Sequence, residues 1–426
     1  MKNRLACFGG APVCKKLNDF NTYDQNEVNA AAKVVKSGVL SGFMAKRGFD
    51  EGGYFVKEFE NKISRYFKVK NVITTNSWTT GIHCMLGAIG LNPGDEVLVP
   101  TWTMCASATM ILNWLAIPVF VDINPYTLNI CIHDLKRKIN KRTKAILVVD
   151  IHGYPSDYSK IKLIAKNFKL KIIIDAAQSP GAMVGKKLAG TLGDIGGYSL
   201  NYHKHFHTGE GGIIVTNSDK LAKRCRYIRN HGEAYITKRE DLSNIIGNNF
   251  RMGEIEAAIG IEQLKKLPSI IKGRIYVAKK IIQILEKYDF LKILNKKFDG
   301  SNVFYMIPIL FDRKIARISR EKFVYALQEE GLKSVIFNGY TNLHKLPIFK
   351  NKKAFGNTNI PWSINETKMK IKYKELSYPI AEKYHRYSFI GFQNCMFKGC
   401  EQDLSKIDKI FHKVCTQLTE LKNLKI

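Results

Sequence analysis

Residues 144–178 read KAILVVDIHGYPSDYSKIKLIAKNFKLKIIIDAAQ. They contain two apolar runs, at 145–149 and 172–174, and between them a segment at 159–168 with the pattern of a helix. Near-continuous apolar strands separated by helices are typical of parallel strands that are covered on both faces of a sheet. This unit therefore predicts an α/β fold.

The same alternation continues over residues 50–220, with further apolar runs at 72–75, 97–100, 119–122 and 213–216 and a helix at 82–91. Thr75, Pro100, Asp122 and Asp175 lie at the ends of runs, where sheets of this kind bind ligands. After residue 253 the pattern changes. The expected elements there are helices at 254–266, 275–288, 319–330 and 404–418 and a strand at 303–310. We therefore expect a large domain at 1–264 and a smaller α+β domain at 265–426.

The composition limits the classes of function. The chain has 426 residues, 45% hydrophobic residues and a net charge of +30. Because the lysines are scattered and no nucleic-acid motif accompanies them, we interpret the charge as solvated surface and expect no nucleic-acid partner. The nine cysteines form no Cys-x-x-Cys pair, which favours reduced thiols in a cytoplasm. Residues 101–121 lack charges, but Asn113 and Pro118 favour a buried helix and strand over a membrane span.

A carboxylate and several hydroxyls follow the expected strands. Asp175 closes a run of three isoleucines, where it could keep the ring nitrogen of pyridoxal phosphate (PLP) protonated; a helix N-cap is the alternative role. Gln178 could reach the ring hydroxyl of the same cofactor. Thr79 and Thr80 at a helix start, and Ser199 at a strand end, are candidates for binding its phosphate.

Lys204 lies in the stretch GYSLNYHKHFHTGEGGIIVTN, residues 197–217, between a strand and a flexible turn. A lysine in a cationic or partly desolvated environment loses basicity and becomes a nucleophile for an aldehyde. His203, His205 and His207 flank it and would share one strand face. They would either ligate a metal or support the lysine and the substrate. No aspartate or cysteine lies beside them, so we expect no metal site.

Two side chains after the run at 97–100 are candidates to pack on the planar cofactor ring. Trp102 offers an indole for stacking, and Met104 lies on the same face of the chain. Ordinary core packing is the alternative for Trp102, so the sequence leaves the ring partner open.

These segments, in this order, resemble the DegT/StrS family of PLP-dependent sugar aminotransferases, which has the fold of aspartate aminotransferase (fold type I). The resemblance extends through most of the chain and weakens in the C-terminal part. It is carried by residues 9–12 (GGAP), 37–41 (SGVLS), 92–97 (NPGDEV), 175–178 (DAAQ), 209–212 (GEGG), 247–254 (GNNFRMGE) and 339–344 (GYTNLH). It implies a large domain with a mainly parallel seven-stranded sheet and a smaller α+β C-terminal domain.

By position, the resemblance makes Lys204 the lysine that forms a Schiff base with PLP. It makes Asp175 the partner of the ring nitrogen and Gln178 the contact to the ring hydroxyl. The aromatic position that stacks on the ring aligns with Met104. The implied phosphate ligands are Thr79, Thr80 and Ser199.

The resemblance also implies a second subunit. Asn249 would reach the phosphate of the neighbouring subunit, so the protein would be a homodimer with shared sites. The candidate substrate contacts are Arg251, His205 and His344. In this family a Gly-Thr pair is common where this chain has Trp78-Thr79.

The implied function is that of a cytoplasmic aminotransferase with no membrane partner. It would move an amino group from glutamate or glutamine to a nucleotide-activated keto-deoxysugar for a surface polysaccharide or glycan. A basic cleft would suit the diphosphate of such a substrate. One alternative is PLP-dependent sugar dehydration, although members with that activity have histidine in place of the lysine. The other is a non-catalytic regulator or nucleic-acid-binding protein on the same fold.

Overall fold

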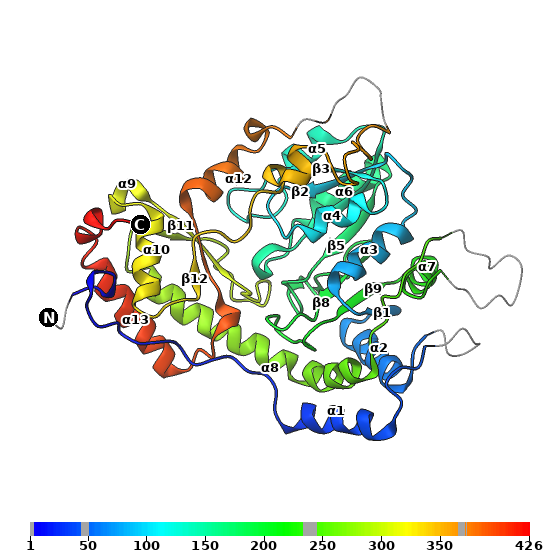
Figure 1. Ribbon diagram of the computed structural model, residues 1–426, viewed down its shortest axis with the longest axis horizontal. Helices are drawn as coiled ribbons and strands as arrows, with labels where there is room; N and C mark the ends of the chain where they lie inside the picture. Colours follow the sequence, from blue (N-terminus) through cyan, green and yellow to red (C-terminus); the bar gives the residue numbers. More distant parts are fainter. Residues whose placement is uncertain (1–3, 44–50, 233–244, 365–370, 372) are drawn as a thin grey trace, which may run out of the picture.

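The structure is a computed structural model that describes residues 4–43, 51–232, 245–364, 371 and 373–426. A seven-stranded sheet forms the centre of the larger part (Figure 1), with the order β1-β9-β8-β5-β4-β2-β3. Every neighbouring pair is parallel except those made by β9. The predicted mainly parallel sheet is confirmed. Its strands are β1 (Asn71–Thr75), β2 (Glu96–Pro100), β3 (Ile117–Val121), β4 (Thr143–Val149), β5 (Lys171–Asp175), β8 (Ile195–Ser199) and β9 (Gly212–Thr216).

Helices cover both faces of this sheet because side chains alternate along each strand. In β4, Leu147 packs into a core with α3, α4 and α7, whereas Ile146 and Val148 pack into the opposite core with α2, α6 and α8. The helices of this part are α1 (Gln25–Ser37), α2 (Tyr54–Phe67), α3 (Trp78–Ala88), α4 (Ala106–Leu112), α5 (Ile132–Lys138), α6 (Tyr158–Phe168) and α7 (Asp219–Arg229). A hairpin of β6 (Met183–Val184) and β7 (Lys187–Leu188) follows β5.

The apolar run at 101–121 folds as predicted, as α4 followed by the fully buried strand β3. Within the residues that the structure describes, no helix has the length and apolar character needed to cross a membrane.

One long helix, α8 (Glu254–Leu285), replaces the two helices that we expected at 254–266 and 275–288. Pro268 lies inside it, yet Leu267 is buried in the core of the large sheet and Ile281 in the core of the smaller part. Burial on both sides of Pro268 offsets the hydrogen bond that proline removes. The expected boundary between residues 264 and 265 lies within this helix, and the two-domain division stays a prediction.

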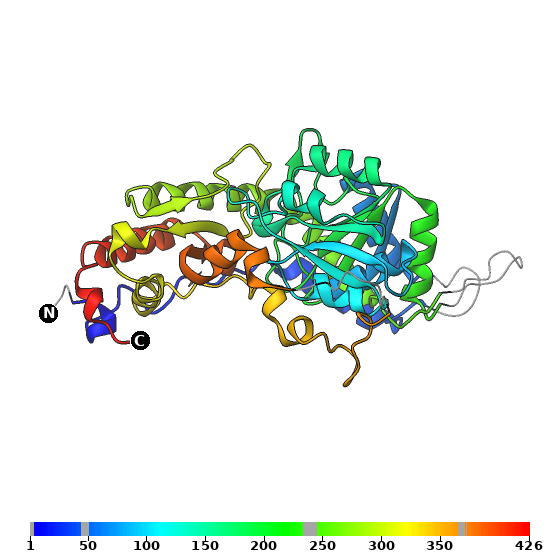
Figure 2. The ribbon, with the colours of Figure 1, turned by 90° about the horizontal axis from the view of Figure 1, so that it is seen from above.

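The smaller part contains an antiparallel sheet in the order β10-β11-β13-β12. The chain termini lie at this end of the molecule (Figure 2), where Leu5 joins the same core as α13. The strand expected at 303–310 begins later, at Ile307. The elements are β10 (Leu291–Ile293), β11 (Ile307–Phe311), β12 (Val335–Ile336), β13 (Phe389–Phe392), α9 (Arg313–Ala316), α10 (Arg320–Glu329), α11 (Pro347–Lys350), α12 (Pro379–Lys383) and α13 (Glu401–Cys415).

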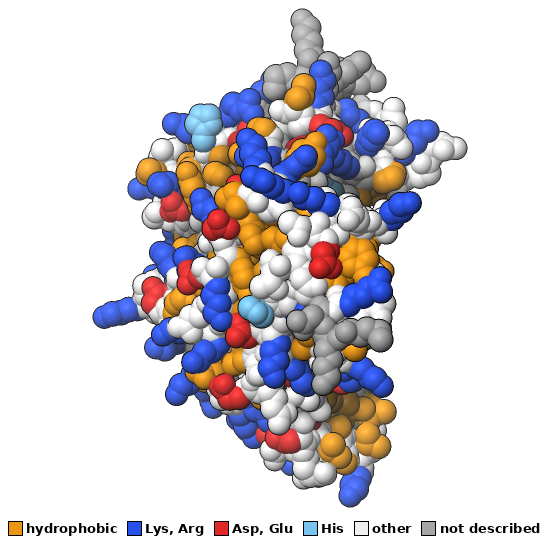
Figure 3. Space-filling model, turned by 90° about the vertical axis from the view of Figure 1, so that its left-hand side faces the viewer, with side chains coloured by type: hydrophobic (Ala, Val, Ile, Leu, Met, Phe, Trp, Pro, Cys, Tyr) orange, Lys and Arg blue, Asp and Glu red, His pale blue; other side chains and the backbone are white. Residues whose placement is uncertain are grey.

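Figure 3 views the molecule from this end. Lys and Arg side chains are spread over the surface, with acidic and apolar side chains between them. This face therefore carries its positive charge as scattered cations, in keeping with the interpretation of the composition.

Candidate active site

A cavity of about 320 Å³ lies at the carboxyl ends of β4, β5 and β8. This is the edge of the sheet at which the strand-end residues were expected to gather. The cavity also receives the first turn of α3 and the segment that leads into α4. The predicted site residues that line it are Thr79, Met104, Asp175, Gln178, Ser199 and Lys204.

Lys204 is buried in the loop between β8 and β9, with 8% of its surface exposed. Its Nζ lies 4.5 Å from the centre of the Tyr305 ring. Burial lowers the pKa of Lys204 to about 8, while the charges of Cys395 and Asp175 act in the opposite direction. A substantial fraction of this amine is therefore neutral near physiological pH, as a nucleophile for an aldehyde must be.

Asp175 ends β5 with both carboxylate oxygens engaged. Oδ1 accepts hydrogen bonds from the indole Nε1 of Trp78 at 2.7 Å and from the backbone N of Ala177 at 3.2 Å. Oδ2 accepts one from the hydroxyl of Ser107 at 2.9 Å. Burial raises the pKa of Asp175, and the bonds from Trp78 and Ser107 oppose that rise. The following residues, 176–181, form turns, so Asp175 does not cap a helix.

Gln178 is held by protein contacts at both ends of its amide. Its Oε1 accepts from the backbone N of His152 at 2.6 Å, and its Nε2 donates to the hydroxyl of Tyr340 at 2.6 Å. Tyr340 follows β12 and belongs to the GYTNLH segment. The amide is therefore fixed with its NH₂ group directed toward the cavity wall that Tyr340 also forms.

Hydroxyls and a helix N-terminus gather at another side of the cavity. Ser77 is the N-cap of α3, and its hydroxyl accepts from the backbone N of Thr80 at 3.2 Å. Thr79 and Ser199 line the cavity, but Thr80 does not: its hydroxyl donates to Asn76 Oδ1 at 2.8 Å. The hydroxyls of Thr79 and Ser199 and the positive end of α3 together suit a phosphate.

The two candidates for the ring partner are separated by the structure. Met104 lines the cavity and is 46% exposed. Trp102 is buried away from it, packs edge-to-face on Phe389 and donates its indole hydrogen to the backbone O of Tyr340 at 2.8 Å. Trp102 therefore has the role of core packing that was its alternative.

The three histidines near Lys204 do not share a strand face, because residues 202–206 form turns and bends. His203 lines the cavity. His205 is buried with its Nε2 2.8 Å from the backbone O of Val303, and His207 contacts Tyr23. In the described parts of the chain, no three His, Cys, Asp or Glu side chains converge as metal ligands. His205 lies outside the residues that line the cavity, and its role as a substrate contact stays a prediction.

The other predicted contacts also lie outside the cavity. The ring of His344 is 1% exposed, with Nδ1 2.7 Å from the hydroxyl of Thr101 and Nε2 2.9 Å from Glu382 Oε1. His344 thus lies outside the cavity, and its role as a substrate contact stays a prediction. Asn249 is exposed and Arg251 is half-buried; Arg251 donates to Asn249 Oδ1 at 2.9 Å and to Asn230 Oδ1 at 3.2 Å.

The sequence-based prediction missed Trp78, Ser107 and Tyr340 as members of the site. Ser107 carried a weak signal, since it is a polar side chain in a charge-free apolar run. Trp78 was noted only as a departure from the family pattern.

The donor set fits PLP. A buried carboxylate suits a protonated ring nitrogen, a lysine of lowered pKa suits an aldehyde, and hydroxyls beside a helix N-terminus suit a phosphate. The volume of the cavity lies at the small end of the range for ligand pockets.

Comparisons with known proteins agree with this chemistry. The model of the DegT/DnrJ/EryC1/StrS aminotransferase family matches residues 29–381. GDP-perosamine synthase of Vibrio cholerae is 30% identical over 331 residues, which are 77% of this chain and 87% of that protein. The structure of DesI with its TDP-sugar product superposes with a TM-score of 0.81, at 22% identity, over 99% of both chains. A GDP-4-keto-6-deoxymannose-3-dehydratase with a trapped PLP-glutamate geminal diamine gives 0.75, at 24% identity, over 93% of this chain and 99% of that one.

Proposed function

Since this chain belongs to the DegT/DnrJ/EryC1/StrS aminotransferase family and is a PLP-dependent aminotransferase, we propose that it aminates a keto sugar carried on a nucleotide, with glutamate or glutamine as the donor. The relative from Vibrio cholerae is a GDP-perosamine synthase, and the structure of DesI was determined in the presence of its TDP-sugar product. One observation carries the proposal: the less basic amine of Lys204 lines the same cavity as the carboxylate of Asp175.

The residues of the cavity would divide the binding of PLP among them. When bound, PLP supplies an aldehyde for the amino group and a ring that takes up electrons. Asp175 would face the ring nitrogen, and the N-terminus of α3 with Thr79 and Ser199 would hold the phosphate. Gln178, fixed at both ends of its amide, would meet the ring hydroxyl.

Lys204 would also move the proton of the reaction. With a pKa of about 8, its Nζ can accept a proton from the α-carbon of the amino donor and release it again near neutral pH. The neighbouring wall of Tyr305 and the burial of the amine limit access of water to that atom. Both properties suit a general base that is used in each half of an amino transfer.

We further propose a cytoplasmic homodimer with shared sites. All nine cysteines are free thiols, which suits a reducing compartment. Asn249 is exposed, and its Oδ1 accepts a hydrogen bond from the half-buried Arg251, so Asn249 would be the residue that reaches the site of a second subunit. Arg251 remains a candidate for contact with the anionic part of the substrate.

Sugar dehydration is the competing reaction for this cofactor. Members of the family with that activity resemble this chain but have histidine at the lysine position, whereas Lys204 is present and lines the cavity. Lys204 therefore favours amino transfer. A regulator without catalysis would have no need for a lysine and a carboxylate buried in one cavity.

Two measurements test the proposal. Borohydride should fix PLP covalently to the purified protein, and peptide mapping should find the label on Lys204. Lys204→Ala should abolish the label, while Lys187→Ala, which changes an exposed lysine on β7, should keep it. A nucleotide-linked keto sugar with glutamate should give an amino sugar. A label on another lysine, or a deoxy sugar as the product, would refute the assignment.

A further inference from the structure

Trp78 lies between the hydroxyls of the cavity that suit a phosphate and the carboxylate of Asp175. It is the first residue of α3, beside the hydroxyls that suit a phosphate, yet its indole Nε1 donates to Asp175 Oδ1 at 2.7 Å. The side chain is only 7% exposed and forms part of the cavity wall. An N–H donor on an ionised carboxylate makes a charge-assisted hydrogen bond, which is stronger than the bond to a neutral oxygen.

Two glycines leave the space that the indole occupies. A Cβ atom added at Gly197 in β8 would lie 2.7 Å from Cζ3 and 2.8 Å from Cη2 of Trp78. A Cβ added at Gly81 would lie 2.9 Å from Cε3. Cβ atoms essentially never lie this close to a non-bonded heavy atom, so a larger residue at Gly81 would displace the ring, and at Gly197 it would meet both the ring and, at 1.9 Å, the backbone O of Ile213. The indole therefore packs directly against two glycines of the site.

Trp78 differs in its acceptor from the other tryptophans of the chain, all of which are described. Trp102 and Trp114 donate to backbone carbonyl oxygens, and Trp362 donates to a phenol oxygen. Only the indole of Trp78 among these four faces a carboxylate. This contrast provides three internal controls for any measurement on indole N–H groups.

We propose that Trp78 is a positioning residue, whose indole N–H keeps the carboxylate of Asp175 ionised and oriented toward the cationic ring nitrogen of the cofactor. Burial opposes ionisation of Asp175, and the indole and the hydroxyl of Ser107 counter it from opposite oxygens. The role deepens the proposed function and rests on it for the identity of the cation that Asp175 meets.

Other titratable groups act on the same carboxylate. Lys204 favours the charged form of Asp175. Burial, and to a smaller extent charges that include Asp175, raise the pKa of Tyr340 and of Tyr158. Both phenols therefore stay neutral at acidic pH. Asp150, whose pKa burial raises to about 7, and His203, whose pKa burial lowers to about 4, lie close to Asp175, so the variant Asp175→Asn is needed to assign a titration to Asp175.

The first test uses cofactor-free wild-type protein, so it is independent of the proposed reaction. The ¹⁵N–¹H signals of the four indoles are followed against pH, after assignment by single Trp→Phe variants. The signal of Trp78 should titrate with the protonation of Asp175 and should cease to do so in Asp175→Asn. A Trp78 signal that does not titrate, or that titrates equally in Asp175→Asn, overturns the proposal.

The second test is Trp78→Phe, which keeps an aromatic ring and deletes the donor. Loss of the donor raises the pKa of Asp175 further, so the carboxyl is protonated at a higher pH. PLP affinity falls at low pH as Asp175 becomes protonated, and we call this fall the acid limb. In Trp78→Phe the midpoint of the acid limb should move to a pH higher by roughly one unit, which is about tenfold weaker binding within that window. The matched control is Trp114→Phe, which deletes a donor to the backbone O of His83 and should leave the limb unchanged.

An unchanged acid limb in Trp78→Phe would overturn the role of Trp78. If this variant does not fold, the wild-type titration decides alone. A shifted limb in a protein that forms no amino sugar would instead reject the proposed substrate and keep the role of Trp78, so the two failures are distinguishable.

Discussion

Burial shifts the pKa values of Lys204 and Asp175 in opposite directions. It lowers the pKa of the lysine to about 8 and raises the pKa of the aspartate, because in each case it disfavours the charged form. Hydrogen bonds from Trp78 and Ser107 oppose the rise in the pKa of Asp175, whereas Nζ of Lys204 has the ring of Tyr305 beside it. The same cavity thus holds an amine of lowered pKa and a carboxyl group whose two oxygens both accept hydrogen bonds.

This difference predicts a distinct pH profile for Lys204. In cofactor-free protein, acylation by acetic anhydride should follow the neutral amine, with a midpoint near pH 8. At that pH an ordinary lysine, with a pKa near 10.5, is less than about 1% neutral. Peptide mass spectrometry after labelling at a series of pH values measures the profile, with lysines at the protein surface as the reference in the same sample. A midpoint near 10.5 would contradict the burial of the amine.

At the scale of residues, the sequence predicted which side chains follow the strands better than it predicted which residues those side chains contact. Asp175 and Lys204 could be proposed because each follows a recognisable apolar run. The partners of Asp175 lie 97 and 68 positions away, and Tyr340 lies 162 positions from Gln178. No periodicity links such residues. Trp102 and Met104 could not be separated for the same reason, since only packing against Phe389 distinguishes them.

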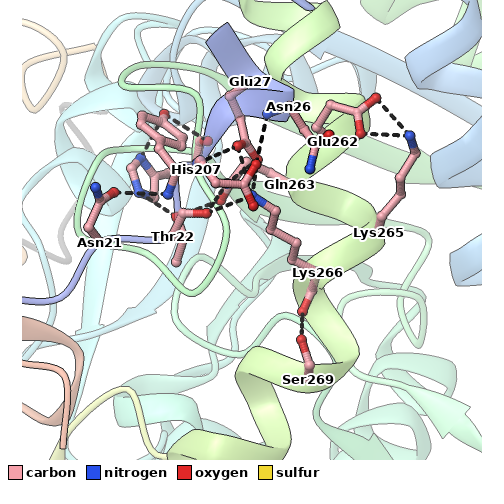
Figure 4. Close-up of polar contacts among 12 residues, drawn as sticks. Asn21, Thr22, Asn26, Glu27, His207, Glu262, Gln263, Lys265, Lys266 and Ser269 are labelled. Carbon is pink, nitrogen blue, oxygen red and sulfur yellow. Dashed lines mark hydrogen bonds and ion pairs between the residues drawn. The ribbon is translucent and has the colours of Figure 1, made fainter. Parts of the chain in front are cut away.

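At the scale of elements, three segments distant in sequence meet (Figure 4): the N-terminal segment, the loop that contains His207, and α8. Thr22 and Tyr23 of the N-terminal segment place their hydroxyls 3.1 and 3.0 Å from the two ring nitrogens of His207. The hydroxyl of Thr22 also donates to Gln263 Oε1 of α8 at 2.8 Å. The N-terminal segment therefore ties the loop that contains His207 to the long helix.

Lys266 of α8 supplies the cation of this cluster. Its Nζ lies 2.7 Å from the carboxylate of Glu27, which is only 3% exposed, and 2.9 Å from Asp24 Oδ2 and from the backbone O of Thr22. Burial raises the pKa of Glu27, but hydrogen bonds from Asp24, Lys266 and Gln263 outweigh it, and the net shift is downward. The ionised carboxylate consequently stabilises the fold above the unfolded pKa of the group, and this contribution is lost as the pH falls through the folded pKa.

Lys266→Met should therefore destabilise the protein in a pH-dependent way. At pH 7 we expect a loss of roughly 1.5–3 kcal/mol, the usual value of a hydrogen bond to a charged group. The loss should shrink as the pH falls through the lowered pKa of Glu27, where this carboxylate becomes protonated. Denaturant unfolding at several pH values measures it. Lys265→Met is the matched control, since Lys265 is 60% exposed and pairs with Glu262 on its own helix; equal effects of the two variants at pH 7 would contradict the argument.

The predictions for elements succeeded where a single pattern was sufficient. The strands β2, β3, β4 and β5 follow their apolar runs closely. The division of α8 into two helices was wrong because Pro268 and Gly273 are helix breakers on a local basis, whereas tertiary burial on both sides decides the outcome. The strand face expected for the three histidines was wrong because alternation over five residues does not distinguish a strand from a series of turns.

At the scale of the whole molecule, the segment after β12 returns to the large sheet and completes the cavity. Tyr340 contributes to the cavity wall, His344 contacts Thr101 at the end of β2, and the backbone of Ala381 donates to Asp122 Oδ1 at 2.9 Å. Residues 339–344 of this segment carry part of the family resemblance, and the family match continues to residue 381. The contribution of the segment to the cavity follows from the strand ends that it meets.

The proposed dimer adds a last prediction. If Asn249 completes the site of the neighbouring subunit, Lys204→Ala and Asn249→Ala should each be inactive or nearly so as pure dimers. In a mixed dimer, one site has both defects and the other has neither. Random reassembly of equal amounts makes half of the dimers mixed, with one intact site each, so about a quarter of wild-type activity should return.

The measurement is the rate of amino-sugar formation after subunit exchange, with exchange verified by native mass spectrometry. Arg226→Ala serves as the matched partner for Lys204→Ala, because Arg226 lies outside the cavity and pairs with Glu51 within its own chain. A mixture of the Lys204→Ala and Arg226→Ala proteins should show only the activity of the Arg226→Ala subunits. Verified exchange between Lys204→Ala and Asn249→Ala without any return of activity would mean that each subunit builds its site alone.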